Sequence, residues 1–139
     1  GETLAEQAPH SQDAQVLTSA VRVALGRGIV QEVAGLRQDL SVMTLDARLE
    51  ELLLQAMQAG EGGGGFEPGL ADRLFKALTE SARRQQIAGE PTVLLVAPKL
   101  RSWIARLTRH ALPGLTVLAY NEVPENRRIN VVAAIGRAG

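Results

Sequence analysis

The residues from Thr92 to Gly136 constrain the fold more than any other part of the chain. They contain three short runs rich in Val, Leu and Ile, TVLLVAP, LTVLAY and INVVAAIG, each bounded by Pro, Gly or polar residues as β-strands are. Between the first two runs, residues 98–112 repeat apolar side chains, Trp103 among them, at the spacing of an amphipathic helix. The sequence therefore predicts strand, helix, strand and strand, with the last two strands joined over a turn and Trp103 in the core.

A long helix is predicted near the N-terminus. Ser11 or Asp13 can cap it, and its apolar side chains recur up to about Ala34. Gly26 and Gly28 interrupt its middle, and each costs a helix about 1 kcal/mol relative to alanine. Glycine at such positions usually indicates close packing or a bend, so we expect this helix to lean on a neighbouring element.

The middle of the chain predicts a strand at residues 40–45 and then two helices. Asp46 can cap the first helix, whose apolar stripe contains leucines 49, 52 and 53 with Ala56 and Met57. A loop with consecutive glycines at 62–65 leads to the second helix, which begins at Glu67-Pro68 and ends at Gly89. The order from Leu40 onward is β-α-α-β-α-β-β. This order predicts an α+β fold with one mixed β-sheet backed by helices.

The composition suits one compact domain, with or without a fragment of another. The chain has 139 residues, of which 45% are hydrophobic, and this length is sufficient to bury a core. It has no cysteine, which excludes disulfides, thiolate metal sites and thiol nucleophiles. No apolar run approaches the length of a membrane span. The polar stretch at residues 35–39 is the best candidate for a domain boundary.

No pattern of catalytic, metal-binding or cofactor-binding residues is found. The glycine run at 62–65 follows a helix and lacks the Lys-Ser/Thr of a phosphate-binding loop, so it is interpreted as a flexible linker. His10 and His110 have no partner at metal-ligand spacing, and no serine has the context of a nucleophile elbow. We therefore expect no catalytic residue, no metal and no cofactor, and we expect that the protein is not an enzyme.

Charge is distributed unevenly although the total is zero. Residues 1–65 carry a net charge of −5 and residues 66–139 carry +5. Such a chain can associate head to tail with its own copies or present its basic end to an anion, although uneven solvated helix faces explain the counts equally simply. A basic surface made of Lys99, Arg101, Arg106 and Arg109, with Arg127 and Arg128, leaves a small nucleic-acid-binding domain as the alternative function.

The segment between the last two predicted strands is richer in polar groups than a tight turn requires. One interpretation is a turn in which Glu122 and Glu125 form exposed ion pairs with Arg127 and Arg128. The other is an exposed loop that recognises a protein, since loops often carry function. The candidate interaction residues are Tyr120, Asn121, Glu122, Pro124, Arg127 and Arg128.

The same residues resemble a known protein family. The stretch from Pro91 to Gly136 is similar to the C-terminal end of the export-gate family of flagella and type III secretion systems, on the flagellar side. The upstream segments LAEQAP, LTSAVRVALGRGIV, LDARLEELLLQA and GGGGFEPGLADRL agree with it in order, so the resemblance spans essentially the whole chain. The combination of LTVLAYNEVP with EPGLADRL is the most specific part.

The resemblance implies a non-enzymatic docking and scaffold part of a protein export gate. Residues 1–36 would end the third, ring-building cytoplasmic subdomain, and residues 37–139 would form the fourth. The implied partners are neighbouring copies in a ring, export chaperones with their substrates, and the export ATPase complex, with no nucleic acid. The implied location is the cytoplasmic face of the bacterial inner membrane, which the protein would reach only through an N-terminal region absent from this sequence.

Overall fold

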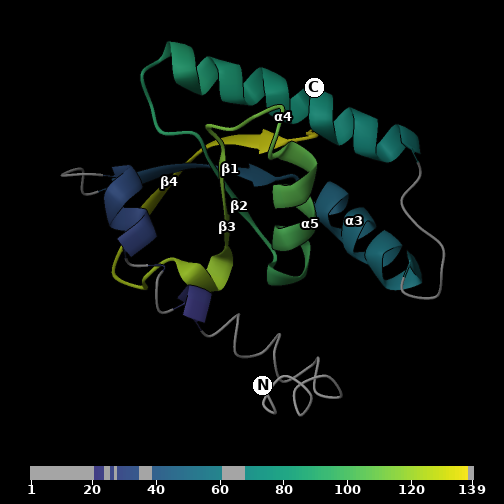
Figure 1. Ribbon diagram of the computed structural model, residues 1–139, viewed down its shortest axis with the longest axis horizontal. Coiled ribbons are helices and arrows are strands. Elements are labelled where there is room, and N and C mark those ends of the chain that lie inside the picture. The colour runs from purple at the N-terminus through teal and green to yellow at the C-terminus, as the bar shows by residue number, and fades with distance from the viewer. Residues whose placement is uncertain (1–20, 24–25, 27, 35–38, 61–67, 138–139) are drawn as a thin grey trace, which may run out of the picture.

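The computed structural model describes residues 21–23, 26, 28–34, 39–60 and 68–137. In these residues, four strands form one sheet in the order β3-β2-β1-β4 (Figure 1). The strands are β1 (Asp39–Leu45), β2 (Val93–Val96), β3 (Thr116–Ala119) and β4 (Arg128–Ile135). The other elements are α3 (Ala47–Gly60), α4 (Pro68–Ile87), α5 (Pro98–Thr108) and the 3₁₀ helix η2 (Tyr120–Glu122), with helical residues at 21–23, 26 and 28–34.

The predicted order of elements is confirmed, but the predicted mixed sheet is wrong. All three strand pairings are parallel, and β3 and β4 are the two edge strands rather than neighbours. The segment 120–127 therefore crosses from one edge of the sheet to the other instead of turning back on itself. A tight hairpin needs only about two to five residues between its strands, and this longer segment reaches the start of β4 beside β1. A fully apolar strand such as β2, buried along its whole length, is typical of a parallel sheet.

The predicted start of α3, end of α4 and start of α5 are confirmed, but the predicted end of α5 is wrong. The Asp46 carboxylate accepts hydrogen bonds from the backbone N–H groups of Arg48 and Leu49 at 3.2 and 3.4 Å, which caps α3. Gly89 has a φ of 72°, a left-handed conformation that favours glycine, and it follows the end of α4. Pro98 is the first residue of α5, which ends at Thr108, earlier than predicted.

The three long helices cover one face of the sheet. Their buried side chains, chiefly Leu53, Leu74, Leu78, Leu100 and Ile104, pack on sheet residues such as Met43 and Leu94. Trp103 packs against this core, as predicted from the apolar stripe, but it is half-buried rather than fully enclosed. Leu52 was predicted in the stripe of α3, but it is 43% exposed and lies beside a hollow between α3 and α4.

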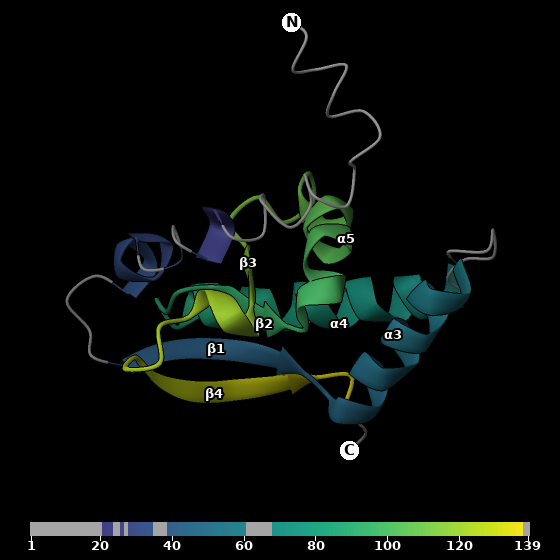
Figure 2. The same ribbon diagram turned by 90° about the horizontal axis from the view of Figure 1, so that it is seen from below.

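The N-terminal helical residues and the segment after η2 cover the opposite face. Val30 and Ala34 are buried against a core that includes Leu40, Val42 and Leu118, and Val123 packs at its margin. In both views, residues 21–23 lie beside η2 (Figures 1 and 2). The predicted helix start at Ser11 or Asp13, the glycine loop at 62–65 and most of the predicted boundary at 35–39 lie outside the described residues.

Candidate functional site

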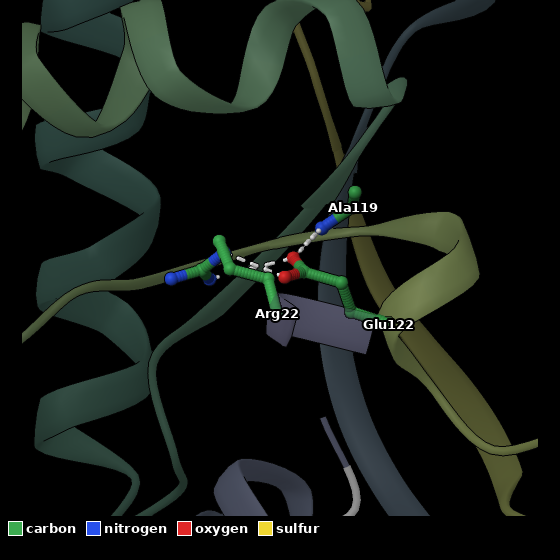
Figure 3. A network of polar contacts seen from close by, with 3 residues as sticks. All are labelled: Arg22, Ala119 and Glu122. Carbon is green, nitrogen blue, oxygen red and sulfur yellow. Dashed lines mark hydrogen bonds and ion pairs between the residues drawn. The ribbon is translucent and has the colours of Figure 1, made fainter. Parts of the chain in front are cut away.

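The predicted interaction segment begins with a buried carboxylate. η2 follows β3 directly and turns the side chain of Glu122 back toward the strand, where its Oε1 accepts the backbone N–H of Ala119 at 2.7 Å. The guanidinium of Arg22 donates to the same carboxylate, from Nε at 2.6 Å and Nη2 at 3.4 Å (Figure 3). Only 4% of Glu122 is exposed. The carboxylate therefore joins the N-terminal helical segment to the end of β3.

Gly26 brings the same helical segment into contact with the backbone of η2. Its position is buried, and a Cβ atom built there would collide with the carbonyl oxygen of Glu122. Arg22 and Gly26 are both helical, and both contact Glu122. This confirms the prediction that glycine marks close packing here. Of the two predicted alternatives, close packing does not apply to Gly28, because Gly28 is exposed and has no neighbouring atom within 4 Å of its Cβ position.

Tyr120 ties the other side of η2 to the helical layer. Its hydroxyl donates toward the two carboxylate oxygens of Glu50, each at 2.8 Å. The same carboxylate accepts the backbone N–H of Ala97 at 2.9 Å, next to the start of α5. Partial burial, and then the hydrogen bond to the Glu50 carboxylate, raise the pKa of the Tyr120 phenol well above its ordinary value. The ring itself is 44% exposed and accessible to a partner.

The rest of the segment is more open. Asn121 is exposed, and with Glu122, Val23 and residues 123–126 it lines a hollow of about 660 Å³. The Pro124 carbonyl accepts the backbone N–H of Arg127 at 3.0 Å, which shapes the turn before β4. This leaves Tyr120, Asn121 and the turn residues as the accessible part of the predicted site.

The predicted ion pairs of this segment are wrong for two residues. Glu122 pairs with Arg22, one hundred positions away in the sequence, instead of with Arg127 or Arg128. Arg128 lies within 3.8 Å of Asp39, its neighbour across the parallel β1–β4 ladder, and both side chains are well exposed. The Glu122–Arg22 contact depends on where the helical segment docks, which no local pattern specifies. Gly26, which was expected to indicate close packing or a bend, was the one sequence feature that pointed to a neighbouring element here.

The structure also gathers part of the predicted basic surface. Arg101, Arg106 and Arg109 line one hollow with Arg22, whereas Lys99, Arg127 and Arg128 do not line it. In the described residues, no group of three or more His, Cys, Asp or Glu side chains is arranged to hold a metal ion. The helices described in the structure are all too short or too polar to cross a membrane.

Comparison with known proteins gives a consistent result. Residues 1–128 match the FHIPEP family. The flagellar biosynthesis protein FlhA of Salmonella typhimurium is 50% identical over 135 residues, which are 97% of this chain and 19% of that protein. FlhA of Yersinia enterocolitica is 48% identical over 137 residues, 99% of this chain and again 19% of that protein. The chain therefore spans about a fifth of the length of these relatives.

The fold has a close counterpart among solved structures. In the complex of the Chlamydia pneumoniae proteins CdsV and CdsO, a chain superposes with a TM-score of 0.71 at 26% identity, covering 96% of this chain and 40% of that one. The α/β fold described above, with its four-stranded parallel sheet, is thus shared with this solved structure.

Proposed function

Because the chain belongs to the FHIPEP family, we propose that it is a non-enzymatic part of a flagellar-type protein export gate. In this proposal it lies at the cytoplasmic face of the bacterial inner membrane. There it serves as a docking and scaffold domain for proteins destined for export. The observation that carries the proposal is 50% identity to a flagellar biosynthesis protein over nearly the whole chain. The sequence contains no recognised catalytic motif, which agrees with a non-enzymatic role.

Assembly into a subunit ring is the second part of the proposal. The solved structure of SctV-C from EPEC is described as nonameric and has a similar fold, at 20% identity and a TM-score of 0.70, over 96% of this chain and 40% of that one. A ring requires two different complementary surfaces on each subunit. The opposite net charges of the two halves of the chain would favour such head-to-tail contacts. Neighbouring copies, export chaperones with their substrates and the export ATPase complex are the proposed partners.

The division into two subdomains is also a proposal. Residues 1–36 would end a ring-building subdomain and residues 37–139 would form the next one. The contact of Arg22 and Gly26 with Glu122, and the burial of Val30 against the sheet, support a firm attachment between them. A displacement of the N-terminal segment by a neighbouring subunit would then also displace η2.

Within this framework, we propose that the segment 120–128 contacts a protein partner through its accessible residues. Tyr120 and Asn121 are consecutive exposed residues, and Asn121 lines the hollow that continues to Asn126. Glu122 and Arg128 are engaged with Arg22 and Asp39, so they would hold the segment in shape instead of making the contact.

A chimera tests the export function directly. The segment of Salmonella FlhA that matches this chain would be replaced by this chain, in a strain that lacks its own copy of that protein. Secreted hook and filament proteins in the culture medium are then measured by immunoblotting. The matched controls are intact FlhA and a deletion of the segment equivalent to residues 40–139, each with the amount of protein in the membrane fraction recorded.

We expect the chimera to restore secretion and the deletion to abolish it at equal membrane levels. A chimera that reaches the membrane but exports nothing would contradict the proposal for this chain. Normal secretion by the deletion would contradict it as well, because the domain would then be dispensable.

For the segment 120–128, Tyr120→Ala with Asn121→Ala in the chimera should reduce secretion without changing the membrane level, and unchanged secretion would refute a contact there.

A further inference from the structure

A basic hollow lies outside the segment 120–128. It has a volume of about 590 Å³ and is bordered by α5, by the residues that lead into β3, and by the N-terminal helical segment. Four arginines line it: Arg22, Arg101, Arg106 and Arg109. We call it the arginine pocket. None of the described residues that line it is acidic.

The positive charge of the arginine pocket is only partly neutralised. Arg22 is paired with Glu122, but the described residues provide no ion pair for Arg101, Arg106 or Arg109. Arg106 donates a hydrogen bond to the hydroxyl of Ser102, which leaves its charge in place. Partial burial lowers the pKa of the Arg101 guanidinium, and the charges of Arg22 and Arg106 lower it further, although the nearby carboxylate of Glu122 acts in the opposite direction. Like charges held this close favour the approach of an anion.

The arginine pocket also has an apolar component. Ile29 from the helical segment, Leu112 and Leu115 from the connection to β3, and Val117 from β3 all contribute to its lining. A lining that combines guanidinium groups with aliphatic side chains matches a ligand that carries both carboxylates and apolar side chains. Arginine is also the side chain best suited to bind carboxylates through paired hydrogen bonds.

We propose that the arginine pocket binds an acidic, amphipathic segment of a protein partner. Its Asp or Glu side chains pair with Arg101, Arg106 and Arg109, and an apolar side chain packs on the Leu112–Val117 side. A nucleic acid fits less well, because none of the described lining residues is aromatic and bases would have nothing to stack on. This inference is independent of the export function, since it depends only on the charge and shape of the pocket.

The probe is a short fluorescein-labelled peptide with Glu and Leu at i, i+3 and i+4 helical spacing, titrated with the whole chain by fluorescence anisotropy. Two further probes are the same peptide with Gln in place of Glu, and a short labelled DNA duplex. The pocket variant is Arg101→Gln/Arg106→Gln/Arg109→Gln. The control variant is Arg48→Gln/Arg73→Gln, which removes arginines that line the separate hollow between α3 and α4. Circular dichroism verifies that each variant is folded.

We expect the pocket variant to bind the acidic peptide about tenfold more weakly, because it removes three ion pairs that are each weak when exposed to solvent. The control variant should bind like the wild type, and higher salt should weaken wild-type binding. Equal binding by the pocket variant, equal loss in the control, or equally tight binding of the Gln peptide would overturn the proposal. Tighter, pocket-dependent binding of the duplex would overturn it in favour of a nucleic acid.

NMR of the wild-type chain provides a readout that does not depend on the variants folding. Backbone amide signals that shift on addition of the acidic peptide should cluster in α5 and in residues 112–117. Shifts that cluster elsewhere, or no shifts at all, would refute the arginine pocket as the binding site.

Discussion

Two glycines in the N-terminal helical segment should respond in opposite directions to the same substitution. At Gly26, an added Cβ collides with the backbone carbonyl oxygen of Glu122. At Gly28, two positions later, no atom lies within 4 Å of the Cβ position. Both residues are helical, and they differ in burial. The Gly26→Ala and Gly28→Ala variants therefore separate the effect of docking on η2 from the effect of helix propensity.

The expected magnitudes follow from two opposing terms. Overpacking a close contact typically costs about 1–3 kcal/mol, and a collision with backbone cannot be relieved by rotating a side chain, so we expect about 3 kcal/mol at Gly26. Alanine gains about 1 kcal/mol over glycine in a helix interior. Gly26→Ala should therefore lower the free energy of unfolding by about 2 kcal/mol. Gly28→Ala should raise it by about 0.5–1 kcal/mol, because only the propensity term applies.

Urea denaturation of both variants, followed by far-ultraviolet circular dichroism, measures the difference. The two variants should differ by roughly 3 kcal/mol, with similar dependence of the free energy on urea concentration. The reasoning would be refuted if Gly26→Ala stabilised the chain as much as Gly28→Ala, since that result would mean that the helical segment does not rest on Glu122. In the secretion assay, a destabilised Gly26→Ala chimera would further test whether this contact matters for export.

Three further predictions address the segment after β3 and the core. Tyr120 is the chain's single tyrosine, so the absorbance titration of its phenol should have a midpoint above pH 10. The midpoint should fall when Glu50→Gln removes the carboxylate, and an unchanged midpoint would contradict the contact between Tyr120 and Glu50. Trp103→Ala should cost about 2 kcal/mol in urea melts, less than the roughly 3–5 kcal/mol of a fully buried ring, and a loss below about 1 kcal/mol would contradict its core contact. Arg128→Ala should change stability by no more than about 0.5 kcal/mol, since its pair with Asp39 is exposed, and a larger loss would contradict that assignment.

Tyr120 also makes the stability of the folded chain depend on pH. Because the folded state raises the pKa of Tyr120, the unfolded chain loses this proton first as the pH rises. The stability that this group contributes is therefore present below about pH 10 and declines above it. Tyr120→Phe should remove this part of the alkaline decline, and an identical decline in the variant would assign it to other groups.

The carboxylate of Glu122 connects the N-terminal helical segment to the end of β3. It accepts a hydrogen bond from a backbone N–H at the end of β3 and from the guanidinium of Arg22, while the backbone carbonyl oxygen of Glu122 lies against Gly26. Leaving a buried charge without its partner is costly, so the three contacts should form and break together. The segment 120–128 is thus fixed at its start and accessible beyond it.

The sequence determined the elements of this protein because their signals are local. Apolar periodicity, the cap at Asp46, Pro98 in a first turn and Gly89 after a helix specify helices and strands through contacts within a few residues. The cap, the proline and the glycine were found as predicted. The same sequence segments also carried the resemblance to the family. Gly26 also indicated close packing or a bend in the N-terminal helix, but it did not indicate which element would be its neighbour.

Only the tertiary structure decided how the strands are arranged and which charges meet. The order β3-β2-β1-β4 depends on which edge is free for β4 and which face each helix covers, and neither is encoded in the period of a strand. The Arg22–Glu122 pair and the gathering of four arginines join residues far apart in the chain. Pairing at such separation is fixed by packing of the whole domain, because many carboxylates and guanidiniums could meet and only the docked backbone selects among them.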